Sequence, residues 1–187
     1  MEPTSVQITI YRHAQAEHNI EPYDVGIYDP LLTSLGLEQS LKAYLDRREQ
    51  KVPDIVLSSV ARRALQTAHR VFPDATIFGT QLLAEYNTLV NCNKLSTEAE
   101  IKTMFPYLRL DYYSSEELPP EFSWDDGAKR ANYVKNLVYG LASTRKYKNI
   151  VLVSHANFIY SLLSIFGQPR LPGEMPNCDK ITFEITI

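Results

Sequence analysis

Short apolar runs that end in polar side chains alternate along this chain with segments of helical apolar spacing. The runs at residues 6–11, 54–57 and 149–153 predict strands. Segments of helical pattern follow them, at residues 34–48, 61–72 and 158–166. Repeated strand–helix alternation favours an α/β fold, and we expect a three-layer α/β/α sandwich with a mainly parallel central sheet.

The remaining elements are shorter or less regular in pattern. They are an edge strand at 76–78, a short helix at 98–104, a helix at 125–141 and a final strand at 181–187. Thr33 is expected to cap the first helix at its N-terminus, and Gly167 to end the last one in the left-handed conformation. The segment 86–121 has no clear period, and its conformation is not predicted.

Composition limits the class of protein. A chain of 187 residues with 44% hydrophobic residues is long enough to bury a core of its own, and we expect one domain over residues 1–187. A net charge of −3 argues against a nucleic-acid partner, which needs clustered cations. Cys92 and Cys178 lack the spacing of a zinc site or a disulfide framework. We predict no metal and no cofactor.

Targeting signals are also missing from the sequence pattern. The first residues carry no basic region followed by an apolar run, and no stretch reaches the roughly 18 apolar residues that a membrane span requires. The expectation is a cytoplasmic protein without a membrane partner, with the nucleus also possible. The oligomeric state is left open.

Chemistry-bearing residues follow three of the predicted strands. Arg12 and His13 end the first strand, the Ser59 turn ends the second, and His155 follows the strand at 149–153. The carboxyl ends of parallel strands share one edge of a sheet, which is where ligands bind in such folds. The sequence therefore predicts that a guanidinium and two imidazoles meet at that edge.

Four motifs in this chain resemble those of the histidine phosphatase superfamily, which includes the phosphoglycerate mutases and many small phosphatases. Residues 12–19 read RHAQAEHN, residues 59–68 read SVARRALQTA, residues 83–85 read LAE, and residues 153–156 read VSHA. The DPLLTSLG stretch at 29–36 and Asn177 extend the resemblance over nearly the whole chain. The match is closest to a eukaryotic branch that carries RHAQ.

The resemblance implies a role for each motif. His13 is the nucleophile that takes the phosphoryl group, while Arg12, Arg63 and His155 hold its oxygens. Asn19 is a further phosphate contact. Glu85 is implied as the acid that protonates the leaving oxygen, and burial would raise its pKa toward neutrality for that task.

Several assignments keep an alternative. His18 is either a substrate-pocket donor or a loop histidine, and Arg62 reads as a solvated helix charge beside Arg63. Glu98 and Glu100 are the rivals of Glu85.

Two alanines depart from the family pattern. Ala14 and Ala156 stand where the family usually has glycine, and Ala156 is a candidate pocket residue. An added methyl group could limit a close approach of the backbone to phosphate, and it disfavours positive φ.

Three functions fit these observations. The first is hydrolysis of a phosphorylated small molecule through phospho-His13, and the second is a mutase that returns the phosphoryl group to its substrate. The third is a catalytically quiet module that binds phosphorylated ligands or proteins. The substrate itself is not readable, because specificity is expected to lie in the segment 86–121.

Overall fold

The computed structural model describes residues 3–86, 89–110 and 126–187. Its centre is one five-stranded sheet in the order β3-β2-β4-β1-β5. The strands are β1 (Ser5–Arg12), β2 (Ile55–Ser59), β3 (Ile77–Thr80), β4 (Asn149–Ser154) and β5 (Lys180–Thr186). The first four run parallel and β5 pairs with β1 in the antiparallel sense. The prediction of a mainly parallel sheet is confirmed.

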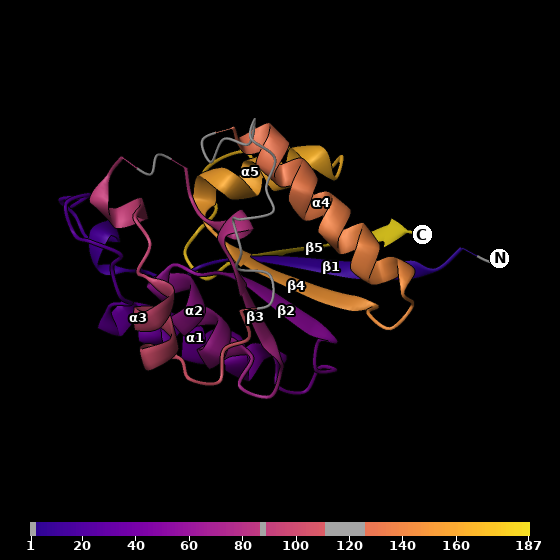
Figure 1. Cartoon of the computed structure of the whole chain (residues 1–187), viewed down its shortest axis with the longest axis horizontal. Helices are drawn as coiled ribbons and strands as arrows, with labels where there is room; N and C mark the ends of the chain where they lie inside the picture. The colour runs from indigo at the N-terminus through magenta and orange to yellow at the C-terminus, as the bar shows by residue number, and fades with distance from the viewer. Residues whose placement is uncertain (1–2, 87–88, 111–125) are drawn as a thin grey trace.

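Helices cover both faces of the sheet. They are α1 (Ser34–Arg47), α2 (Arg62–Val71), α3 (Glu98–Met104), α4 (Gly127–Ser143) and α5 (Ala156–Ile165). Figure 1 shows α4 and α5 together on one face, and α1 and α2 on the other with α3 beside them. The predicted α/β/α sandwich is therefore confirmed.

Strand side chains point alternately to these two layers. Ile8 and Ile10 of β1 are fully buried in the cluster beneath α4 and α5. Tyr11 belongs to the opposite cluster, which packs against α2. Because a strand buried on both faces needs apolar residues at successive positions, the central strands read as continuous apolar runs.

Helix α1 is held against the loop that follows β1. Thr33 caps it as predicted, its hydroxyl accepting the N–H of Gly36 at 3.0 Å. A Cβ atom at Gly36 would lie 2.0 Å from the carbonyl oxygen of Gln15. Only glycine permits this approach, and the contact fixes the backbone just beyond His13.

Helix α5 begins two residues before the predicted position 158. His155 is its N-cap, with extended backbone angles, and Glu85 accepts the N–H groups of Asn157 and Phe158. The carboxylate comes from a distant stretch of chain, so the local sequence pattern could not place this helix start. Gly167 ends the helix with φ +68°, as predicted.

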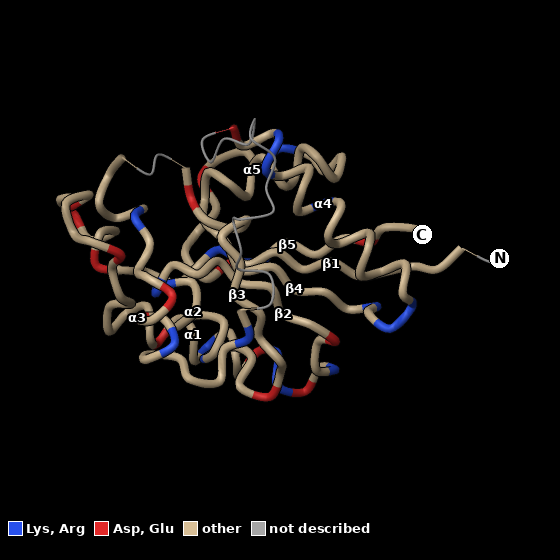
Figure 2. The backbone as a smooth tube through the Cα atoms, viewed as in Figure 1, with Lys and Arg blue, Asp and Glu red and all other residues tan. Residues whose placement is uncertain are grey.

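Charge is spread over several elements in Figure 2. The turn between α4 and β4 carries Arg145, Lys146 and Lys148, and it lies at the amino end of β4, opposite the end that leads to His155. Across the three described ranges, every helix is too short or too polar to cross a bilayer.

Candidate active site

Two imidazoles meet where β1 and β4 end. The strands are in register with Arg12 opposite Ser154, so the next residues, His13 and His155, leave the sheet side by side. Their ring centroids are 5.0 Å apart, and each residue is no more than 2% exposed. The predicted convergence of these histidines is confirmed.

The contacts of His13 define its tautomer. Its Nδ1 lies 2.7 Å from the carbonyl oxygen of Ala14, which can only accept a hydrogen bond. Nδ1 therefore carries the proton and Nε2 keeps its lone pair. Burial and the nearby Arg63 guanidinium hold the pKa of His13 well below its usual range, so the ring is neutral at physiological pH.

Arg63 lies beside that lone pair. It is 1% exposed, and its Nε–H donates to Nε2 of His13 at 3.4 Å. Its Nη1 donates to the carbonyl of Cys92 at 2.7 Å and its Nη2 to the Asn93 side chain at 3.3 Å. These contacts place a fixed positive charge against the nucleophile candidate, at the position that the family register indicated.

Arg62 has a different environment from the predicted one. We expected a solvated helix charge, but its side chain donates to the backbone carbonyls of Asp29 and Tyr28. Its backbone N–H also donates to the buried Asp29 carboxylate at 3.0 Å. The solvated assignment was wrong because the 21–31 loop folds over the start of α2.

His155 keeps one nitrogen for a ligand. Its Nε2 is 2.8 Å from the hydroxyl of Ser59 at the end of β2, while its Nδ1 is buried without a partner among the described residues. Burial, followed by the Arg63 charge, lowers the pKa of His155 well below its usual range. A neutral ring with Ser59 donating to Nε2 presents an N–H at Nδ1.

Arg12 is buried and only partly bonded. Its Nη1 donates to the carbonyl of Met175 and forms an ion pair with Glu174 at 2.8 Å. Its Nε is buried and has no partner within the described part of the chain. Buried donors are normally satisfied, so this N–H is available to an acceptor.

His18 and Asn19 line a cavity next to these groups. The His18 ring lies 5.8 Å from that of His13, and burial lowers the pKa of His18 to about 3. Nδ1 of His18 is also buried without a described partner. Asn19 contacts Nε2 of His18 at 3.2 Å and accepts the N–H of Ala16. The pocket position of His18 is therefore favoured over the loop alternative.

Glu85 follows a short 3₁₀ turn after β3 and contacts the start of α5. Its two oxygens accept N–H groups from Tyr86, Asn157 and Phe158 at 2.9–3.1 Å. Burial nevertheless raises its pKa, against the opposing effect of these bonds and of the Arg63 charge. The raised pKa agrees with the expected direction for an acid.

Glu98 and Glu100 sit in a different setting. They lie in the first turn of α3, where Glu98 pairs with Lys102 and Glu100 completes a capping box with Thr97. These contacts give Glu98 and Glu100 structural roles in α3.

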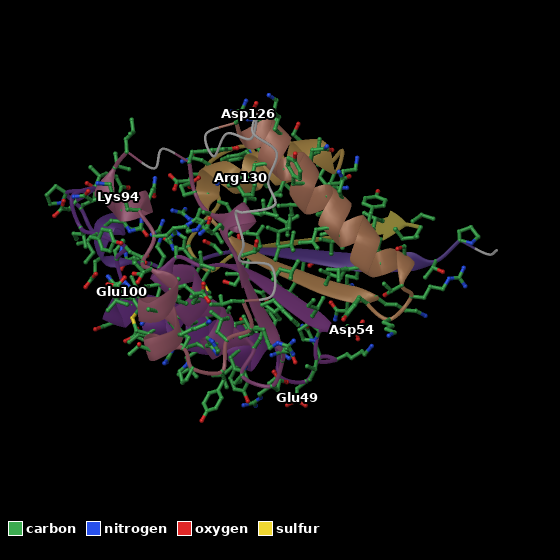
Figure 3. All side chains as sticks on the ribbon, viewed as in Figure 1. Glu49, Asp54, Lys94, Glu100, Asp126 and Arg130 are labelled. Atoms are coloured by element: carbon green, nitrogen blue, oxygen red, sulfur yellow. The ribbon has the colours of Figure 1, made fainter. Side chains whose placement is uncertain are left out.

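Several residues at the site were not identified from the sequence. Arg130 of α4 is fully buried, with its guanidinium 4.1 Å from the Phe158 ring, and its position beside α5 is visible in Figure 3. Thr67 accepts the N–H of Ala14 at 3.0 Å, and Asn177 donates to the carbonyl of His13 at 3.2 Å. Thr67 and Asn177 had a sequence signal through the family resemblance, whereas Arg130 had none.

The two alanines cause no backbone strain. Three non-glycine residues in the described ranges have positive φ, and neither Ala14 nor Ala156 is among them. Ala14 packs with Ala16 and Leu32, and Ala156 is the first residue of α5. The backbone at both positions therefore accommodates a methyl group.

The described residues contain no group of three or more His, Cys, Asp or Glu side chains arranged to hold a metal ion. Positive charge near the two histidines comes from Arg12 and Arg63, while the Arg130 guanidinium lies next to Glu85. The Arg12 and Arg63 guanidiniums and the two imidazoles are suited to bind a small, highly charged anion.

Comparison with known proteins identifies the family of the chain. The family model of the histidine phosphatase superfamily (branch 1) matches residues 8–180. A relative named "Putative phosphoserine phosphatase 2", from Hydrogenobacter thermophilus, is 27% identical over 169 residues, which cover 85% of this chain and 77% of that protein.

Solved structures share the fold. The native mycobacterial glucosyl-3-phosphoglycerate phosphatase has a TM-score of 0.62 at 20% identity, over 96% of this chain and 90% of that one. Phosphoserine phosphatase from Entamoeba histolytica, in complex with 3-phosphoglyceric acid, has a TM-score of 0.62 at 20% identity, over 95% and 89% of the two chains.

The chain belongs to the histidine phosphatase superfamily, branch 1. It is a phosphoric monoester hydrolase.

Proposed function

We propose that the chain hydrolyses phosphomonoesters by a two-step route through a phosphohistidine at His13. The observation that carries the proposal is a set of three buried nitrogens without described partners: Nε of Arg12, Nδ1 of His18 and Nδ1 of His155. All three belong to residues gathered around His13 at the carboxyl ends of β1 and β4. A phosphoryl group is an acceptor with three oxygens, and it would satisfy such donors.

In the first step, Nε2 of His13 attacks phosphorus. The P–N bond forms, the ester P–O bond breaks, and Glu85 gives its proton to the departing oxygen. Proton donation at neutral pH requires a protonated carboxyl group, which the raised pKa of Glu85 favours. Arg12 and Arg63 offset the negative charge on the phosphoryl oxygens.

In the second step, water attacks the phosphohistidine. Glu85, now a carboxylate, accepts a proton from that water, the P–N bond breaks, and inorganic phosphate leaves. His13 returns to its neutral form with the proton on Nδ1, held by the Ala14 carbonyl. No metal takes part in either step.

The test is phosphate release from p-nitrophenyl phosphate by a His13→Ala variant. We expect loss of essentially all turnover with an unchanged circular dichroism spectrum, and no effect of EDTA on the unmodified protein. His69→Gln is the matched control, because His69 stacks on Phe105 away from the site. Unaltered turnover in His13→Ala would refute the proposal.

A further inference from the structure

A cavity of about 660 Å³ adjoins the proposed phosphoryl site. Its lining includes Arg12, His18, Asn19, Tyr23, Gln39 and Glu174. Arg12 and His18 belong both to this lining and to the set of unpartnered donors. If the proposed function holds, on which this inference rests, the alcohol part of a bound phosphomonoester extends into this cavity.

Glu174 brings a negative charge into the cavity. Its carboxylate lies 2.8 Å from Nη1 of Arg12, and its side chain is 65% exposed, so it is accessible to a ligand. Glu21 adds a second carboxylate near the rim, where a hydrogen bond from Tyr23 to Glu21 raises the pKa of Tyr23. The lining side chains named above include one guanidinium, Arg12, and no lysine.

The charge balance changes when the phosphoryl site fills. A phosphomonoester dianion carries two negative charges, which match the positive charges of Arg12 and Arg63. His13 and His155 are neutral and add nothing to this balance. Arg12 then faces the dianion as well as Glu174, and the carboxylate is left without a full counter-charge of its own.

We propose that Glu174 selects phosphomonoesters whose alcohol part carries a cationic nitrogen, as in an amino-alcohol phosphate. Such a nitrogen restores neutrality at Glu174, and the exposed Tyr23 ring beside it provides an aromatic face for a cation. A carboxylate at the same place meets like charge, which costs binding free energy.

The test compares three small substrates of similar size in the unmodified protein: phosphoethanolamine, propyl phosphate and phosphoglycolate. They carry a cation, no charge and an anion on the alcohol part. We expect kcat/KM to fall in that order, by about tenfold or more between the first and the last. The difference should narrow at high salt, because this site is open to solvent.

A Glu174→Gln variant should reduce the ratio of phosphoethanolamine to phosphoglycolate kcat/KM about fivefold or more. Glu49→Gln makes the same change of charge ahead of the amino end of β2, at the opposite end of the sheet from His13, and should leave the ratio unaltered; Figure 3 labels Glu49. Equal rates for the two charged substrates, or a ratio that Glu174→Gln does not move, would overturn the inference.

The two proposals fail differently. Turnover of propyl phosphate that needs His13, together with a preference for phosphoglycolate, would overturn the selectivity and leave the proposed function standing. Absence of turnover for all three esters and for p-nitrophenyl phosphate would overturn both.

Discussion

Nε of Arg63 donates to Nε2 of His13 across 3.4 Å, so the guanidinium faces the only lone pair of the imidazole ring. The residues are fifty positions apart, and each is almost completely buried. Burial and this contact together keep the histidine neutral, and the contact places a positive charge beside any group that Nε2 attacks. It is the relationship on which the proposed chemistry depends.

Replacing Arg63 by lysine should lower kcat/KM for p-nitrophenyl phosphate by about a hundredfold or more. Lysine keeps the charge but loses the fork that contacts His13, Cys92 and Asn93, and one lost charge-stabilising donor typically costs that much. Steady-state kinetics measure the effect.

The neighbouring Arg62→Lys variant is the control. Arg62 contacts the carbonyls of Asp29 and Tyr28, so its replacement should lower the melting temperature and have little effect on kcat/KM. An Arg62→Lys rate defect equal to that of Arg63→Lys would contradict our assignment.

A Glu85→Gln variant should lose more activity on alkyl phosphates than on p-nitrophenyl phosphate. An alkoxide needs a proton to leave, whereas p-nitrophenolate is a good leaving group without one. The ratio of the two rates is the informative quantity, because it cancels any loss of folded protein.

Glu98→Gln serves as the comparison for Glu85, since Glu98 was a rival from the sequence and pairs with Lys102 on α3. A uniform loss across both substrate types in Glu85→Gln would argue for a structural role at the start of α5.

Two of the helix glycines, Gly36 and Gly140, give opposite predictions for stability. Gly36→Ala should lower the free energy of unfolding by about 1–3 kcal/mol, because its Cβ would overlap the Gln15 carbonyl. Gly140→Ala should raise it by about 0.5–1 kcal/mol, since nothing lies within 4 Å and alanine favours the helix. Urea unfolding measures both, and a stabilised Gly36→Ala would contradict the packing of α1 on the His13 loop.

Mild acid should destabilise the fold. Histidine binds a proton near its usual pKa of 6.5 when unfolded, whereas burial lowers the pKa of His13, His18 and His155 in the folded protein. The stability that these three neutral rings give the folded protein is fully present above pH 6.5 and is lost as the pH falls below that value. Each histidine adds about 1.4 kcal/mol per pH unit to the slope of the unfolding free energy against pH.

Glu85 acts with the opposite sign, since its raised pKa makes the folded state take up its proton first as the pH falls. Unfolding free energies measured between pH 6.5 and 4.5 report mainly on the histidines, because most carboxylates stay ionised over that range. A His18→Asn variant should show a slope smaller by about 1.4 kcal/mol per pH unit. An identical slope in the variant would show that His18 is not held neutral in the folded protein.

The sheet and the meeting of the two histidines were predictable because both follow from local pattern. An apolar run at 149–153 predicts a buried parallel strand, and a parallel strand carries His155 to the same edge as His13. Arg63 could be placed through the family motif, whereas physical reasoning alone did not separate it from Arg62.

Other features depend on contacts that no local pattern records. The start of α5 is set by Glu85, seventy-two residues before Asn157, and the side chain of Arg62 is half-buried against a loop without periodicity. The Arg12–Glu174 ion pair joins a strand end to an irregular segment near the C-terminus. Such long-range polar contacts arise only when the chain is folded.

The central claim is a covalent bond between phosphorus and His13, and trapping that bond tests it most directly. The protein is mixed with p-nitrophenyl phosphate, quenched within milliseconds in alkali, digested, and the peptides are mapped by mass spectrometry. The account predicts a phosphate on Nε2 of His13 that is stable in alkali, lost in acid and absent from the His13→Ala variant. Phosphate on Ser59 instead, or turnover with no phosphorylated peptide at any quench time, would contradict it.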